Sequence, residues 1–402
     1  MTQTFHSKIN LLSDDRYYDL FANSNQWGIN HDVIRTIIGD SPVQEYIIKS
    51  HPYWLPGLNG SATYETDPQT EYFKNYADSI ETHWDSIRAG DTRLVFLLQD
   101  WWTTMNEQEK AHSPNMEGEF TSLDLYNTLY HSLKARDLLA GSRFVCGSSI
   151  QGVVQHTDWP IYDYNEPFLR WSMLKNYPVE TATSFRKHFL WLNRRLRTHR
   201  VLALHEAYKH QLLQHCTYTA HEWSELDETF YEDTIRAYTD EVDMSFAEFN
   251  GRQYIGDSYD VSTDVQYVPE ALATRNASAD CFAEIVTEFN YSDNKVYLTE
   301  KIARAIVNKK PFLIIGDRNS LKELQRMGFR TFNNFWGESY DTQPGIYNRI
   351  KKVMYQLQNI VQTIDLNQPY TDEMHSVLEH NYRHFFGAFT DQQNKKLESI
   401  FA

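Results

Sequence analysis

Apolar runs alternate with helical patterns along much of the chain, most clearly in its last third. Residues 310–316 form a largely apolar strand that ends in glycine. An amphipathic helix precedes this strand after Leu298, and a second helix over Ser320–Met327 leads to a further short strand at Gly328–Phe332. Such alternation of helices and strands predicts a parallel α/β sheet.

The same alternation appears upstream. A buried strand at Arg93–Asp100 is followed by a helix at Ser122–Leu139 and a strand at Ser142–Gly147. A strand at Lys187–Asn193 and a helix at Arg200–Gln214 begin a second series. Two helical patterns close the chain, and the first has an apolar stripe made of Ile346, Ile350, Val353, Leu357, Ile360 and Ile364. We therefore expect an α/β fold with helices at its C-terminal end.

Composition and charge narrow the class of protein. The chain has 402 residues, of which 41% are hydrophobic and 14% aromatic, so it can build more than one core. The net charge is −16, and residues 1–180 hold 13 basic against 24 acidic side chains. This balance disfavours nonspecific binding to polyanions and places a phosphate site in the second half of the chain.

Targeting and metal signals are weak. The three cysteines are too few and too scattered for a disulfide framework or a zinc site. The first ten residues are polar, unlike a signal peptide, and the sequence has no run of about 18 apolar residues. We therefore expect a cytoplasmic protein with no membrane span and no bound metal.

Basic residues cluster between Arg186 and Arg200, where six of fifteen positions are Lys or Arg. Asn193, Arg194 and Arg195 stand at the end of the predicted strand. Ligands of open α/β sheets bind at the carboxyl ends of the strands, and Arg suits bidentate phosphate recognition. The cluster is either part of a phosphate site or a solvated basic loop.

The segment Thr299-Glu300-Lys301 opens the helix before the 310–316 strand. The start of a helix offers free N–H groups and a positive dipole, to which Lys301 adds a cation. Glu300 can accept hydrogen bonds from sugar hydroxyls. A capped helix with a surface ion pair explains the same residues. The presence of two basic segments favours one shared diphosphate site.

Together these segments resemble the C-terminal, donor-binding domain of GT-B glycosyltransferases. The nearest groups are the α1,3-fucosyltransferase-like and exostosin-like families and a set of phage-encoded transferases. The resemblance spans residues 185–345. It rests on Phe189–Arg195, His199-Arg200, Thr287-Glu288, Tyr297–Lys301, Pro311-Phe312, Gly328-Phe329 and Glu338–Asp341.

The resemblance implies two Rossmann-like domains that face a cleft. Residues 1–175 would bind the acceptor, and residues 176–345 would bind a nucleoside-diphosphate sugar, either a UDP- or a GDP-sugar. Helices over residues 346–402 would pack back on the N-terminal domain. No cofactor beyond the donor is implied.

The resemblance also implies roles for residues. Lys301 would neutralise the diphosphate, Arg200 would bind it, and Glu300 would bond ribose or sugar hydroxyls. The implied donor-binding set is Asn193, Arg194, Arg195, Arg200, Glu288, Thr299, Glu300 and Lys301. Glu288-Phe289-Asn290 departs from the Glu-Asn pair of fucosyltransferases, and their acceptor motifs are absent. The identities of donor sugar and acceptor therefore do not transfer.

An inverting transfer needs one carboxylate to deprotonate the acceptor hydroxyl. Asp100 ends the clearest early strand, and Glu117 and Glu119 lie in the predicted loop that follows. Each of the three is also typical of a solvated loop carboxylate. These residues are the candidate catalytic groups.

The sequence thus predicts a metal-independent, inverting glycosyltransferase that moves a sugar from a nucleoside-diphosphate sugar to an acceptor hydroxyl. The acceptor is a glycan or lipid-linked sugar, or else a hydroxymethylated base of phage DNA. A phage-encoded enzyme would act in the host cytoplasm. The alternative is a non-catalytic nucleotide- or sugar-binding module with the same fold.

Overall fold

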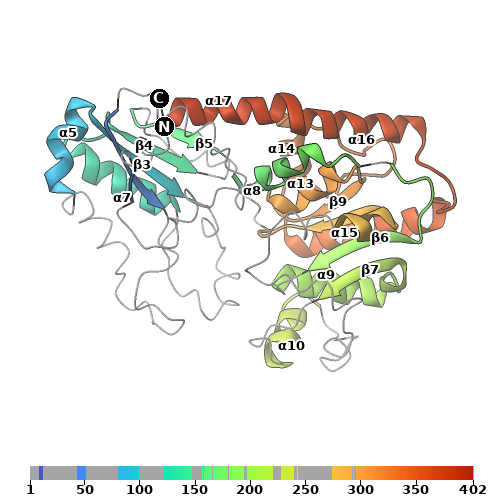
Figure 1. Ribbon diagram of the computed structural model, residues 1–402. Helices are drawn as coiled ribbons and strands as arrows, with labels where there is room; N and C mark the ends of the chain where they lie inside the picture. The colour runs from blue at the N-terminus through green and yellow to red at the C-terminus, as the bar shows by residue number, and fades with distance from the viewer. Residues whose placement is uncertain are drawn as a thin grey trace. The chain divides into compact units, whose positions relative to one another are not determined.

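The computed structural model is an α/β protein in which helices flank parallel sheets (Figure 1), and the predicted α/β class is confirmed. The structure describes residues 9–11, 43–50, 80–98, 122–146, 156, 158–164, 166–179, 181–193, 197–220, 228–239, 242, 274–291, 293 and 296–401. No helix among the described residues is long and apolar enough to cross a bilayer.

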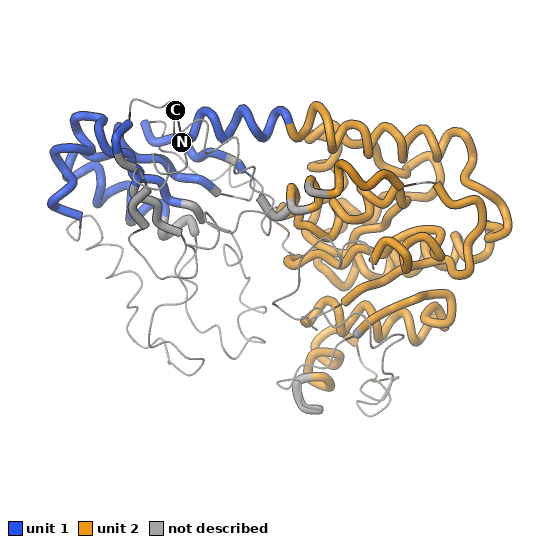
Figure 2. The backbone as a smooth tube through the Cα atoms, in the orientation of Figure 1, with its two compact units in different colours: residues 1–167, 391–402 blue, residues 168–390 orange. Residues whose placement is uncertain are grey.

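The chain separates into two compact units (Figure 2). The first contains residues 1–167 and 391–402, and the second contains residues 168–390. The last helix, α17 (Thr390–Phe401), therefore belongs almost entirely to the first unit.

The first unit holds a five-stranded sheet in which all neighbouring strands are parallel. The strand order follows the chain: β1 (Ile9–Leu11), β2 (Glu45–Ser50), β3 (Thr92–Leu98), β4 (Ser142–Cys146) and β5 (Ile161–Asp163). Its described helical elements are η1 (Glu81–His83), α5 (Trp84–Ala89) and α7 (Ser122–Lys134). Strands β3 and β4 pair in parallel, and α7 connects them in the sequence. This part is therefore the strand-helix-strand unit that the sequence predicts.

The core of the first unit is aromatic. Leu129 and Leu133 of α7 are buried. Tyr126 stacks on Trp159 with ring centroids 5.0 Å apart and donates to the Trp159 carbonyl at 2.5 Å. The edge of the Phe144 ring faces Tyr126 at 4.9 Å. Several of the chain's many aromatic residues are thus used for packing.

Helix α17 is held to the first sheet by a buried hydrogen bond. The hydroxyl of Tyr46 in β2 donates to the Phe401 carbonyl at 2.6 Å, and the two rings lie 5.9 Å apart. Ile400 and Phe401 are almost fully buried. The end of the chain therefore completes the core of its first half.

The second unit holds a four-stranded parallel sheet with the order β7-β6-β8-β9. Its strands are β6 (Lys187–Asn193), β7 (Cys216–Ala220), β8 (Cys281–Thr287) and β9 (Phe312–Ile315). From β6 the chain moves to one side of the sheet, and from β8 to the other. The carboxyl ends of β6 and β8 therefore form a topological switch point, where ligands of such sheets bind.

Helices α13 (Glu300–Val307) and α15 (Ile346–Thr363) pack on this second sheet (Figure 1). The other described helical elements from here on are α8 (Glu166–Leu169), which lies at the boundary of the two units, η2 (Arg170–Asn176), α9 (Thr198–Lys209), η3 (Leu213–His215), α10 (Glu228–Arg236), α14 (Ser320–Arg326), α16 (Asp372–His384) and η5 (Phe385–Phe389). Helix α9 packs on α15, whereas α13 packs on α16 and η2. The predicted stripe of α15 is buried at Ile346, Ile350, Val353, Leu357 and Ile360.

The short strand expected at Gly328–Phe332 is wrong. This segment has no regular secondary structure. Its backbone forms hydrogen bonds with helix α16 and not with a neighbouring strand. Asn381 of α16 accepts from the Arg330 N–H at 2.8 Å and donates to the Arg330 carbonyl at 2.9 Å. The Phe329 N–H bonds back to the Leu324 carbonyl. One asparagine thus replaces the ladder partner that a strand would need.

A buried ion pair joins β8 to α13. The Glu284 side chain is fully buried, and it accepts from Arg304 Nε at 3.1 Å and from Ser278 Oγ at 2.8 Å. The Arg304 side chain is only 10% exposed. Both oxygens of the carboxylate are therefore satisfied, which is the condition for keeping a charge inside a core.

We expect Arg304→Met to lower the free energy of unfolding by about 3–5 kcal/mol, because it leaves the Glu284 carboxylate buried and uncompensated. Adding Glu284→Gln should recover part of the loss. The control Arg326→Met removes an exposed pair with Glu323 and should cost about 1 kcal/mol or less. Urea denaturation measures all three variants. Equal losses in the two single variants would contradict the proposed role of burial.

Candidate functional site

The carboxyl ends of β6 and β8 bring together segments that lie far apart in the sequence. Asn193 ends β6, and Glu288 directly follows β8. The Thr299 cap of α13 and the first turn of α9 meet the same residue, Glu288. The candidate site is built around this edge of the sheet.

The main chain of Glu288 ties α9 to β8. Its carbonyl accepts from His199 Nε2 at 2.9 Å and from the Arg200 guanidinium at 3.2 Å. Arg200 also reaches the Thr287 carbonyl at 3.4 Å. His199 and Arg200 are both buried in the first turn of α9. The basic segment therefore turns inward at these two positions.

The Glu288 carboxylate ties β8 to α13. It accepts from the Thr299 N–H at 3.1 Å and from Thr299 Oγ1 at 2.5 Å. Burial raises the pKa of this carboxyl, and the nearby charge of Lys301 opposes the shift. Thr299 Oγ1 in turn accepts from the Lys301 N–H at 3.4 Å as the N-cap of α13. The capped-helix interpretation of this segment is therefore correct, and its cap is itself anchored.

Lys301 and Glu300 are the accessible part of this edge. Lys301 Nζ lies 2.7 Å from Glu300 Oε1 and 3.1 Å from Thr299 Oγ1. Their side chains are 21% and 26% exposed, respectively. A cation and a carboxylate thus stand at the start of a helix, beside its N–H groups and positive dipole.

Buried polar atoms without a partner gather near the same edge. Asn193 is fully buried, and its carboxamide N and O both lack a hydrogen bond among the described residues. The same holds for His199 Nδ1 and Asn290 Nδ2. Each such atom costs about 1–3 kcal/mol unless water or a ligand bonds it. The edge therefore has hydrogen-bonding capacity that the described protein groups do not use.

His199 is held as a neutral imidazole. Burial, and next the charge of Arg200, lower the pKa of His199 well below its usual value. Because Nε2 donates to the Glu288 carbonyl, Nδ1 carries no proton and can only accept. The ring also lies 4.7 Å from that of Tyr291.

An aromatic surface lies in the adjoining segment. The Arg197 guanidinium lies 3.7 Å from the centroid of the Phe289 ring. Arg197 precedes α9, and Phe289 follows Glu288 by one residue. Flat groups of this kind suit stacking against a base or a sugar.

Sequence analysis missed Arg349 of α15, which holds the loops at this edge. Its guanidinium is 2% exposed and donates to the carbonyls of Gly316 (3.1 Å), Tyr291 (2.7 Å) and Gln343 (2.8 Å). It also pairs with the Asp293 carboxylate. The helical spacing of the sequence could have identified Arg349, because it lies three residues after Ile346 and therefore on the apolar face of the helix.

The structure therefore brings together six of the predicted donor-binding residues: Asn193, Arg200, Glu288, Thr299, Glu300 and Lys301. Arg194 and Arg195 lie outside the described residues, as do the candidate catalytic residues Asp100, Glu117 and Glu119. Within the described ranges, no group of three His, Cys, Asp or Glu side chains is placed to hold a metal ion.

Neither the protein-family models nor the curated proteins searched contain a match to this chain.

The segment Glu338–Asp341, part of the resemblance, has structural contacts. Asp341 accepts from the N–H groups of Leu321 (3.0 Å) and Lys322 (3.3 Å) and so caps α14. Glu338 accepts from the Phe332 N–H at 2.7 Å. Burial raises the pKa of Glu338 from 4.5 to about 7.

This shift predicts a pH dependence of stability. The folded state holds the Glu338 proton more tightly than the unfolded state, so stability should fall as pH rises from 4.5 to about 7. Glu338→Gln should remove that fall, a gain of about 3 kcal/mol at pH 8 relative to pH 4.5. Urea denaturation at several pH values measures it, with the exposed Glu398→Gln as control. An equal effect of Glu338→Gln at all pH values would refute the assignment.

Proposed function

We propose that this chain is a glycosyltransferase that moves a sugar from a nucleoside-diphosphate sugar to an acceptor hydroxyl. We further propose that its two units are the two Rossmann-like domains of a GT-B enzyme. One observation carries the proposal: the segments that resemble a donor-binding domain converge at the switch point of a parallel sheet. Phosphate-bearing ligands bind at such points.

The donor diphosphate would lie at the start of α13. Lys301 supplies a partly exposed cation, and the helix start adds N–H groups. Glu300, now paired with Lys301, would exchange that contact for hydroxyl groups of the ribose or sugar. Asn193 and His199 Nδ1 offer unused hydrogen-bonding atoms nearby.

Transfer would proceed by attack of the acceptor oxygen on the anomeric carbon. The bond from that carbon to the diphosphate oxygen breaks, and the electron pair leaves with the nucleoside diphosphate. Lys301 and the α13 dipole stabilise the charge that develops there. The hydroxyl proton passes to a carboxylate, for which Asp100, Glu117 and Glu119 are the candidates. One displacement inverts the anomeric configuration, and no metal is needed for it.

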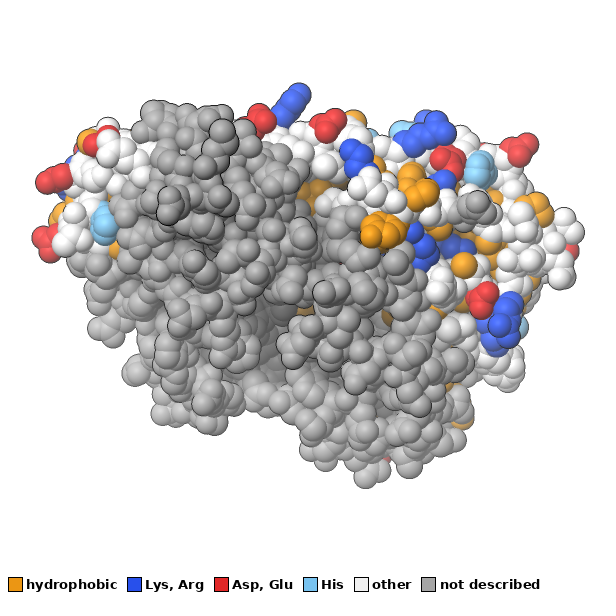
Figure 3. Space-filling view, in the orientation of Figure 1, with side chains coloured by type: hydrophobic (Ala, Val, Ile, Leu, Met, Phe, Trp, Pro, Cys, Tyr) orange, Lys and Arg blue, Asp and Glu red, His pale blue; other side chains and the backbone are white. Residues whose placement is uncertain are grey.

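The acceptor is best supported as a glycan hydroxyl. A DNA base would have to leave the helix, and the protein would need a basic track for the backbone phosphates. The net charge is −16, and the first 180 residues carry most of it. On the face in Figure 3, described basic side chains are interspersed with acidic ones rather than forming a continuous track.

Lys301→Ala should weaken donor binding about tenfold or more while the protein stays folded, because it removes a charge-assisted contact from a partly exposed position. Calorimetric titration with UDP- and GDP-sugars measures this. Lys322→Ala, an exposed lysine on α14, is the matched control. Unchanged affinity in Lys301→Ala would refute the site. Arg200→Ala is less informative, since Arg200 is 3% exposed and its loss should also lower stability.

A transfer assay separates the remaining candidates. With a panel of nucleotide sugars, we expect mass spectrometry to detect a hexose-sized addition to a glycan acceptor. We also expect no gel retardation of DNA containing hydroxymethylated bases at low salt, because the charge of the protein is unfavourable. Retardation of the DNA together with modification of its bases would identify DNA, and not a glycan, as the acceptor. Donor binding without turnover on any acceptor would favour the non-catalytic module.

A further inference from the structure

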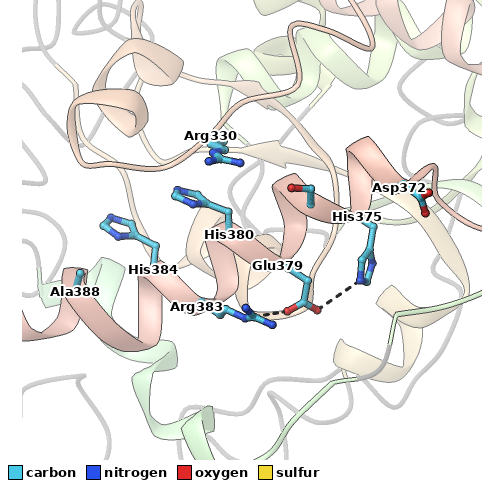
Figure 4. Close-up of a pocket in the computed structure, with 9 residues that line it drawn as sticks. Arg330, Asp372, His375, Glu379, His380, Arg383, His384 and Ala388 are labelled. Atoms are coloured by element: carbon cyan, nitrogen blue, oxygen red, sulfur yellow. Dashed lines mark ion pairs between the residues drawn. The ribbon is translucent and has the colours of Figure 1, made fainter.

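A groove of about 720 Å³ runs along the outer face of α16, away from the switch point described above. Figure 4 shows its lining. It is formed by Arg330 and by residues of α16 and η5: Asp372, His375, Ser376, Glu379, His380, Arg383, His384 and Ala388. Three histidines and two arginines in one groove are notable in a protein of net charge −16.

Two of the histidines are rigidly placed. His380 Nε2 lies 3.0 Å from the Gly328 carbonyl, and His384 Nε2 lies 2.8 Å from the Met327 carbonyl. Both nitrogens must therefore donate, and each ring keeps Nδ1 for another partner. The rings are nearly parallel, with centroids 5.8 Å apart and planes at 12°.

Gly328 permits this approach. Its φ is +93°, and a Cβ atom there would lie 2.6 Å from His384 Nε2. The edge of the His384 ring also packs against Phe329, with centroids 4.8 Å apart. The ring is therefore held on several sides, and its position does not depend on a bound molecule.

Arg330 stands on the same side of α16 as these rings (Figure 4). Its backbone is clamped by Asn381 at both N–H and carbonyl. Its guanidinium makes no hydrogen bond or ion pair with any residue that the structure describes. An exposed cation on a clamped backbone, with no counter-charge among the described residues, thus lies on the same side of α16 as two fixed imidazoles.

The acidic groups of the groove are engaged or distant. Glu379 also lines the groove, and its carboxylate is contacted by Arg383, His375 and Lys309. Asp372 lies at the far end of the groove from His384 (Figure 4). Arg330 therefore has no acidic partner among the described groove residues.

We propose that this side of α16 binds the phosphate group of a phosphomonoester through Arg330, His380 and His384. The guanidinium offers paired N–H donors to phosphate oxygens. Each imidazole in its protonated form adds an Nδ1–H donor. The site is separate from the donor site and does not depend on the proposed transfer.

Imidazole ¹H–¹⁵N NMR of the full chain, titrated with inorganic phosphate at one fixed pH, tests this directly. The His380 and His384 signals should shift saturably. Arg330→Gln should weaken binding about tenfold or more, since a charged donor is lost from an exposed side chain. His384→Gln keeps an N–H donor for the Met327 carbonyl but removes the second ring nitrogen, so it should also weaken binding.

Arg383→Gln and His375→Gln are the matched controls, because both side chains contact the Glu379 carboxylate. Their affinities should stay within about twofold of the parent chain, as expected for exposed charges. Lys301→Ala should leave these histidine shifts intact, which separates them from binding at the donor site. Repeating the titration with glycerol phosphate and with vesicles containing phosphatidic acid distinguishes a soluble ester from a lipid headgroup.

Three outcomes would overturn the proposal. They are shifts that chloride reproduces at equal ionic strength, shifts that do not saturate, and shifts that persist at equal affinity in Arg330→Gln.

Discussion

Glu288 buries both its main-chain carbonyl and its carboxylate, and both groups need hydrogen-bond donors. The candidate site depends on the residues that supply these donors. The carbonyl takes its donors from His199 and Arg200 in α9, and the carboxylate takes its donors from Thr299. An unsatisfied group of either kind would cost several times the net value of one hydrogen bond. Three segments separated by many residues are thereby held at one point of the sheet edge.

Arg349 extends the same constraint to the neighbouring loops. It bonds carbonyls that follow β8 and β9, and it pairs with Asp293, whose carboxylate also accepts from the Gly345 N–H. In contrast to these groups, the side-chain carboxamide of Asn193 and the Nδ1 atom of His199 form no hydrogen bond with described residues. A rigid frame with unused donors and acceptors binds a polar ligand with little reorganisation, which is the condition for tight and specific recognition.

The features that the sequence predicts well are those decided locally. The apolar runs at β3, β6 and β9 and the stripe of α15 need only hydrophobic periodicity, and the Thr299 cap needs only the start of a helix. The prediction failed at Gly328–Phe332, since its backbone partner is Asn381, about fifty residues further along the chain. Arg349 and the Asp341 cap of α14 depend on equally distant contacts, which no local pattern contains.

The predicted site residues divide by burial rather than by residue type. Arg200 and Lys301 are both cations that the sequence assigns to a diphosphate, but Arg200 is 3% exposed and its contacts reach main-chain carbonyls. Lys301 keeps a fifth of its side chain exposed, and its ammonium group bonds its neighbours Glu300 and Thr299. A buried arginine bonded to carbonyls shapes an edge, whereas a partly exposed lysine can change partners. The frame and the ligand contact are therefore supplied by different residues, and a basic motif in the sequence does not distinguish them.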